Sequence, residues 1–200
     1  MERTHAARAA TRWLVATMSA VALLGAAAHA RADVSSPWAA EQNWISVRAG
    51  YAKASVKAAA DGLGGFGFGF NHFRNSKWAF GAYAHYEVLG RFGPAQEIEV
   101  PLTAEVTRHF KWTTPARPYL GLGTGAFFHK TYRTGDDGSD TRTGYYVVGG
   151  MNAPISDHSL FGLDLRAIVE TSARSTNPVF PNSSANAIHW SVKLDYSRHE

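Results

Sequence analysis

The stretch Glu97-Ile-Glu-Val-Pro-Leu-Thr-Ala-Glu-Val-Thr107 alternates between two kinds of side chain. Apart from Pro101, its odd positions are charged or hydroxyl-bearing, and all its even positions are apolar. Successive side chains of a β-strand point to opposite faces of the sheet, so this period of two predicts a strand with one polar and one apolar face. The predicted strand covers residues 97–112.

Seven further segments show the same period of two: 43–53, 63–74, 77–90, 118–132, 143–153, 159–172 and 187–197. In 63–74, phenylalanine alternates with glycine. In 143–153 the alternation can be assigned in two ways, with either the odd or the even residues on the apolar face, because Tyr145 and Tyr146 are adjacent. Eight segments of this kind in one chain predict an all-β fold.

The links between these segments alternate in length. Those after the second, fourth and sixth segments are short: 75–76, 113–117 and 154–158. Those after the first, fifth and seventh are longer, and the third is intermediate: 54–62, 133–142, 173–186 and 91–96. Short periplasmic turns and longer outer loops are typical of outer-membrane barrels. We therefore predict an eight-stranded antiparallel up-and-down transmembrane β-barrel.

The first residues have the pattern of a secretory signal peptide. Three arginines lead into an uncharged and largely apolar run from Trp13 to Ala28. Two small-residue cleavage patterns follow, so cleavage after Ala30 or after Ala32 stays open, with Ala32 preferred. An uncleaved membrane anchor is the alternative, but the run is short for a spanning helix of ~20 residues.

These features divide the chain into a cleavable signal helix, 1–32, and an outer-membrane β-barrel domain, 33–200. The whole chain has 20 Lys and Arg residues and 16 Asp and Glu residues. The signal contains four of the arginines and one glutamate, so the remaining domain has 16 basic and 15 acidic residues. This near-neutral balance gives no electrostatic case for binding nucleic acid, which would need a basic patch or stripe. Cysteine is absent, which excludes disulfides, thiol nucleophiles and zinc–thiolate sites.

In such a barrel the charged faces line the interior and the apolar faces contact lipid. Tryptophans near the strand ends are expected to form the interfacial girdles: Trp44, Trp78, Trp112 and Trp190. The glycines of 65–69 and 121–125 are expected to make room in the lumen for large side chains opposite. Their spacing is not that of a dinucleotide-binding loop, so no cofactor is predicted.

Six residues are candidates for a chemical site: Glu97, Glu99, Glu105, His85, His109 and His189. The glutamates could bind a cation or form an acid/base pair, but we favour a solvated outer rim together with a lumen ion pair. The histidines lie on separate segments without the spacing of metal ligands, so a metal site is disfavoured. The sequence thus predicts no catalytic, cofactor-binding or metal-binding residue.

Two parts of the second half resemble known proteins. The run Pro118-Tyr-Leu-Gly-Leu-Gly-Thr-Gly-Ala126, with the hairpin 144–166, resembles small eight-stranded outer-membrane proteins of the OmpA/OmpX/OmpW-like barrel type. His189-x-Ser191-x-x-Leu194-x-Tyr196 is similar to the terminal-strand signal of the barrel-assembly machinery, with serine in place of glycine. The resemblance implies a fold and an outer-membrane location, but it names no substrate.

The seventh segment also resembles part of an enzyme family. The segment beginning Arg166-Ala-Ile168 resembles the seventh strand of lipid A deacylases of the PagL type, which carries a His-x-Ser motif. Here Val169 takes the place of the general-base histidine and Thr171 that of the nucleophilic serine. His189 and Ser191 keep the spacing, but the predicted phase turns both into the lumen. We therefore predict that the protein is not an enzyme.

The expected function is a structural, adhesive or protective role at the cell surface, supported by the polar segment Thr134–Asp140. Outer-membrane lipid, lipopolysaccharide and, during assembly, the barrel-assembly machinery are the expected partners. The alternatives are a narrow channel for small apolar molecules and a lipid A-modifying acyl hydrolase with a non-standard site.

Overall fold

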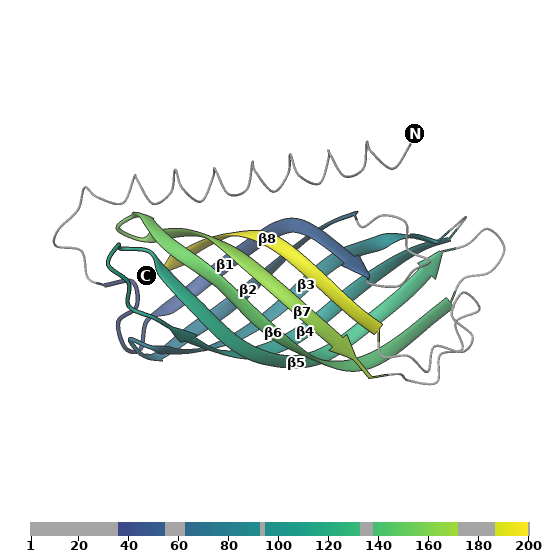
Figure 1. The fold of residues 1–200 in the computed structure, drawn as a ribbon, viewed down its shortest axis with the longest axis horizontal. Helices are drawn as coiled ribbons and strands as arrows, with labels where there is room; N and C mark the ends of the chain where they lie inside the picture. The colour runs from purple at the N-terminus through teal and green to yellow at the C-terminus, as the bar shows by residue number, and fades with distance from the viewer. Residues whose placement is uncertain (1–35, 55–62, 93–94, 133–137, 172–186, 200) are drawn as a thin grey trace.

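The computed structural model describes residues 36–54, 63–92, 95–132, 138–171 and 187–199. They form eight antiparallel strands that close into one barrel in sequence order (Figure 1). The strands are β1 (Asn43–Ala54), β2 (Leu63–Asn75), β3 (Trp78–Phe92), β4 (Ala95–His109), β5 (Arg117–Tyr132), β6 (Gly138–Ser156), β7 (Ser159–Glu170) and β8 (Ala187–His199). The predicted signal peptide and both cleavage positions lie outside the described residues. No helix among those residues is long and apolar enough to cross a membrane.

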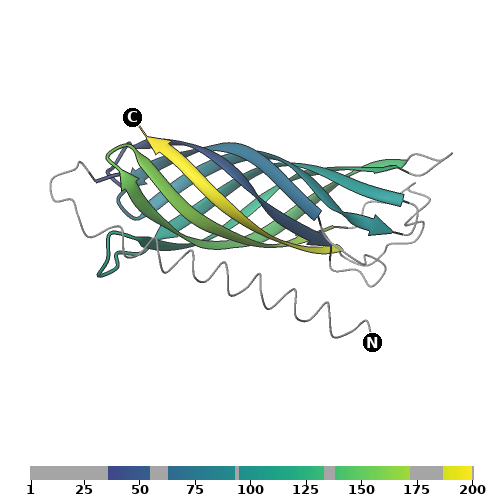
Figure 2. The ribbon, with the colours of Figure 1, turned by 90° about the horizontal axis from the view of Figure 1, so that it is seen from above.

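The barrel closes where β1 pairs with β8, from Trp44 opposite His199 to Ala54 opposite His189. Two views show the strands steeply inclined to the long axis of the barrel (Figures 1 and 2). We call the end where residues 76–77, 110–116 and 157–158 link the strands the turn end. The end where β1, β3, β5 and β7 stop is the loop end.

The predicted alternation of link lengths holds only in part. At the turn end the link 110–116 is longer than predicted, and at the loop end only residues 93–94 separate β3 from β4. Strand β6 also begins at Gly138, inside the predicted loop 133–142. Residues 138–142 pair with 127–131 of β5, whose backbone groups need these partners.

The two faces of the barrel follow the predicted phases. Many outward-facing apolar side chains are exposed, up to 67% at Leu122, and others such as Ile98 and Val100 are half-buried. Charged side chains such as Arg48 point inward and are buried. The sequence left undecided which residues of β6 face the lumen. The structure shows that Tyr146, only 3% exposed, points inward, whereas Tyr145, 64% exposed, points outward.

The four expected girdle tryptophans divide into two groups. Trp78 and Trp190 are exposed on the outer face, as predicted, and Trp112 is exposed in the link between β4 and β5. The prediction for Trp44 was wrong, because this side chain is 1% exposed and lies inside the barrel. Trp44 is an even number of residues from Ser46 and Arg48, so the strand's own alternation turns it inward with them.

The prediction that glycines make room for large side chains holds for some of them: Gly67, Gly69 and Gly123 face rings, whereas a Cβ on Gly121 or Gly125 would first meet the backbone of β4. A Cβ atom on Gly69 would collide with the ring of Tyr83, and one on Gly123 would collide with the ring of Tyr146. The glycines therefore determine which large side chains fit into the lumen.

Candidate functional site

Ion pairs occupy the middle of the lumen. We define the central cluster as five buried side chains from four strands: Arg48, Glu105, Asp164, Arg166 and Asp195. Arg48 Nε donates to Asp195 Oδ2 at 2.6 Å, and Arg48 Nη1 lies 3.2 Å from Asp164 Oδ2. Arg166 pairs with Asp164 at 2.7 Å and with Glu105 at 2.9 Å. The two guanidinium groups thus connect β1, β4, β7 and β8 through the lumen.

Three tyrosines surround the central cluster, and each hydroxyl contacts one of its charged groups. The contacts are Arg48 Nη2 to Tyr83 at 2.8 Å, Tyr119 to Asp164 Oδ2 at 3.0 Å, and Tyr146 to Glu105 Oε2 at 2.9 Å. Buried tyrosine hydroxyls are normally hydrogen-bonded in this way. Nearby, Lys193 Nζ donates to Glu87 Oε1 at 2.6 Å and to Ser191 Oγ at 3.0 Å.

A second polar group lies towards the loop end. We define the loop-end cluster as five buried side chains: Glu97, Glu99, His129, Glu170 and His189. Both ring nitrogens of His129 are 2.8 Å from a carboxylate, Nδ1 from Glu97 Oε1 and Nε2 from Glu170 Oε2. Both nitrogens can donate only in the imidazolium form. His189 Nε2 lies 3.0 Å from Glu170 Oε1, and its Nδ1 lies 3.5 Å from Glu99 Oε2.

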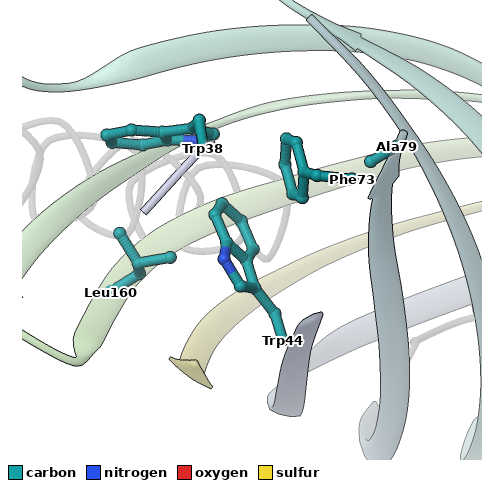
Figure 3. Packing of buried hydrophobic residues seen from close by; sticks show 5 residues of the cluster. All are labelled: Trp38, Trp44, Phe73, Ala79 and Leu160. Atoms are coloured by element: carbon teal, nitrogen blue, oxygen red, sulfur yellow. The ribbon is translucent and has the colours of Figure 1, made fainter. Parts of the chain in front are cut away.

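Apolar side chains fill the turn end. We define the turn-end plug as Trp38, Trp44, Phe73, Ala79 and Leu160, all of which are buried. Figure 3 shows the Trp44 side chain between those of Trp38 and Phe73. The Trp44 ring centroid is 4.5 Å from that of Phe73 and 5.9 Å from that of Trp38. Trp44 Nε1 donates to the carbonyl of Pro37 at 2.8 Å, so residues just before β1 help to fill the lumen.

The three candidate glutamates all point into the lumen, but they belong to different clusters. Glu105 pairs with Arg166, which confirms the predicted lumen ion pair. The prediction of a solvated rim was wrong for Glu97 and Glu99, which are 3% and 0% exposed. All three occupy odd positions of β4, so they share the inward face along its whole length.

The three candidate histidines are also buried in the lumen, yet the structure does not bring them together. His85 stacks on Tyr83 with ring centroids 5.9 Å apart, and His109 stacks on Tyr119 with centroids 5.1 Å apart. Only His189 lies among potential metal ligands.

In the part of the chain that the structure describes, one set of three residues could hold a metal ion: Glu99, Glu170 and His189. One ligand atom from each lies within 4.8 Å of the others. The absence of a metal site was predicted from spacing along single segments. These ligands come from β4, β7 and β8, so that spacing could not reveal them. His129, which no sequence pattern singled out, is the register partner of Glu99 on β5.

The positions that correspond to a lipid A deacylase motif lie near the loop end of β7. Val169 is on the outer face and provides no acid/base group. The Thr171 hydroxyl donates to the carbonyl of Thr143 at 2.8 Å. His189 and Ser191 face the lumen, as predicted, with exposures of 3% and 2%.

No protein-family model matches the sequence, and none of the curated proteins matches it. Among solved structures, Neisserial surface protein A (NspA) is similar with a TM-score of 0.61 and 16% identity over 78% of this chain and 96% of that chain. Ail, the attachment invasion locus protein of Yersinia pestis, is similar with a TM-score of 0.54 and 12% identity, over 80% of this chain and 99% of that chain. The N-terminal β-barrel domain of Pseudomonas aeruginosa OprF is similar with a TM-score of 0.51 and 14% identity, over 80% of this chain and 98% of that chain. The chain therefore has the fold of small eight-stranded outer-membrane barrels, which confirms the resemblance inferred from its sequence.

Proposed function

We propose that this protein is an integral outer-membrane protein of a Gram-negative bacterium whose closed barrel carries a structural, adhesive or protective role at the cell surface. One observation supports this most directly. The barrel is apolar outside and charged inside, with Phe68 64% exposed and Leu122 67% exposed while Asp164 and Lys193 are 0% exposed.

An apolar outer face of this kind is suited to lipid. Large contiguous apolar patches on soluble proteins are uncommon and are aggregation-prone in water. A closed barrel also pairs the backbone groups of every strand, which is the condition for crossing the hydrocarbon region without a helix. Exposed Trp78 and Trp190 then suit the interfaces between lipid and water.

The filled lumen argues for a surface role and against a channel. The turn-end plug, the central cluster and the loop-end cluster occupy successive levels of the interior. An eight-stranded barrel has an interior just wide enough for side chains to fill. The names of two similar structures, a surface protein and an attachment invasion locus protein, support a role of this kind.

The proposed partners are outer-membrane lipid and lipopolysaccharide at the outer face and the barrel-assembly machinery during insertion. The last strand supports the second partner. Leu194 and Tyr196 of β8 are each 44% exposed on the outer face, and β8 closes the barrel against β1.

Cell fractionation of a Gram-negative host expressing the full chain tests the proposal. We expect the protein in the outer-membrane fraction, with a gel mobility that changes on heating because the folded barrel resists detergent. Recovery as a soluble periplasmic protein would contradict a membrane location.

Planar-bilayer recording of the purified protein tests the closed lumen separately. We expect no steady conductance. A regular single-channel current would favour the channel alternative, and it would leave the membrane location intact.

A further inference from the structure

Buried carboxylates outnumber buried permanent cations in the described lumen. Seven carboxylates are buried: Glu87, Glu97, Glu99, Glu105, Asp164, Glu170 and Asp195. Four permanent cations are buried with them: Arg48, Arg142, Arg166 and Lys193. Since an unpaired buried charge is costly, the position of the excess negative charge matters.

The excess lies in the loop-end cluster. The two arginines of the central cluster pair with its three carboxylates, and Lys193 pairs with Glu87. Of the three remaining glutamates, Glu170 lies 3.3 Å from the nearest arginine, Arg142, which also pairs with Asp140 at 2.8 Å. His129 compensates part of this charge through its hydrogen bonds to Glu97 and Glu170.

Glu99 is the least compensated of these carboxylates. Its side chain is 0% exposed, and neither of its oxygens accepts a hydrogen bond from a cationic or ring-nitrogen group among the described residues. The nearest cationic or ring-nitrogen contacts of Oε2 are His129 Nε2 at 3.4 Å and His189 Nδ1 at 3.5 Å.

His189 is in a similar position. Its side chain is 3% exposed, and neither ring nitrogen makes a hydrogen bond in the described part of the chain. Glu170 Oε1, only 3.0 Å from His189 Nε2, also lacks one. Three buried side chains from β4, β7 and β8 thus direct unbonded ligand atoms towards one another across the lumen.

We propose that Glu99, Glu170 and His189 bind one divalent transition-metal ion of the zinc type inside the loop end of the barrel. Zinc bonds to carboxylate oxygen and imidazole nitrogen are about 2.0–2.2 Å long, so a single ion spans ligand atoms separated by up to about 4 Å. The present separations reach 4.8 Å at most, and small side-chain rotations would close the difference.

The donor set selects this class of ion. Two carboxylates and one imidazole suit zinc or manganese, whereas calcium takes six to eight oxygen ligands. Three protein ligands leave a coordination position for water. His129, hydrogen-bonded to Glu170, is a positioning residue that orients one ligand. The ion would supply the positive charge that the loop-end cluster lacks.

Zinc titration by calorimetry tests the site in the purified full-length protein after chelator treatment, together with elemental analysis. We expect one zinc ion per chain, and affinity at least about tenfold lower in Glu99→Gln and His189→Gln, since even changes to residues that only orient a ligand cost about 10–100-fold. His85→Gln is the matched control, because His85 is also a buried lumen histidine but lies outside the site. No binding to the unmodified protein, or equal binding to all variants, overturns the proposal.

A measurement on the unmodified protein covers the case in which the variants do not fold. Zinc-edge X-ray absorption of the loaded protein should show one imidazole together with oxygen ligands. A spectrum with two or more imidazoles would assign the ion to other histidines and overturn the site.

Discussion

Arg48 of β1 and Asp195 of β8 form an ion pair across the seam that closes the barrel. They are register partners in the β1–β8 ladder, and Arg48 Nε donates to Asp195 Oδ2 at 2.6 Å. Both side chains are almost completely buried, at 2% and 1% exposure. Arg48 also reaches Asp164 of β7, so one guanidinium group joins the first strand to the last two.

We expect Arg48→Ala to lower the free energy of unfolding by about 3–5 kcal/mol, because it leaves buried carboxylates without their cation. Urea unfolding in lipid vesicles, followed by tryptophan fluorescence, measures this change. Arg74→Ala is the control, since Arg74 pairs with Glu41 at 2.9 Å but both are exposed, and such pairs contribute about 0–1 kcal/mol. Equal losses in the two variants would contradict a stabilising role for the seam.

Gly123→Val is expected to destabilise the barrel by about 1–3 kcal/mol through overpacking. The new side chain would meet the ring of Tyr146 and displace its hydroxyl from Glu105. Gly149→Ala is the control, because a Cβ there meets only ordinary contacts, the nearest at 3.5 Å. The same unfolding measurement applies, and a Gly123→Val variant as stable as Gly149→Ala would refute the account of this glycine.

The strands and their faces could be predicted because each depends on a local period of two. Where two aromatic residues are adjacent, as at Tyr145 and Tyr146, the pattern could not choose a phase. The choice depends on Gly123 of the neighbouring strand, whose missing side chain leaves room for the Tyr146 ring. That information lies in the register between strands and not within one segment.

The candidate site was less accessible to prediction for the same reason. Glu99 and His189 could each be assigned to the lumen face of a strand. That the two side chains lie close to each other depends on closure of the barrel and on side chains that reach across it. His129 meets Glu99 through the β4–β5 register. The link lengths were also predicted poorly, because a strand extends as far as its neighbour offers backbone partners. Strand β6 begins at Gly138 since β5 provides partners for its first residues.

Lipid quenching should distinguish the inward and outward tryptophans. Brominated acyl chains quench indoles that contact lipid, so Trp190→Phe should reduce the quenched fraction of the fluorescence. Trp44→Phe should leave the quenched signal nearly unchanged, because Trp44 lies in the turn-end plug at 1% exposure. Loss of quenching in Trp44→Phe would mean that this side chain faces lipid, as the sequence alone had indicated.

A charge placed on the outer face tests whether that face contacts hydrocarbon. Phe68 lies near the middle of β2 and is 64% exposed. We expect Phe68→Arg to reduce the free energy of unfolding in vesicles by about 2–4 kcal/mol, the cost of arginine at the bilayer midplane. Phe68→Leu is the control, because it keeps the position apolar and should change stability far less. If Phe68→Arg and Phe68→Leu unfold alike, the outer face of β2 does not contact lipid, and the proposed membrane location loses its main support.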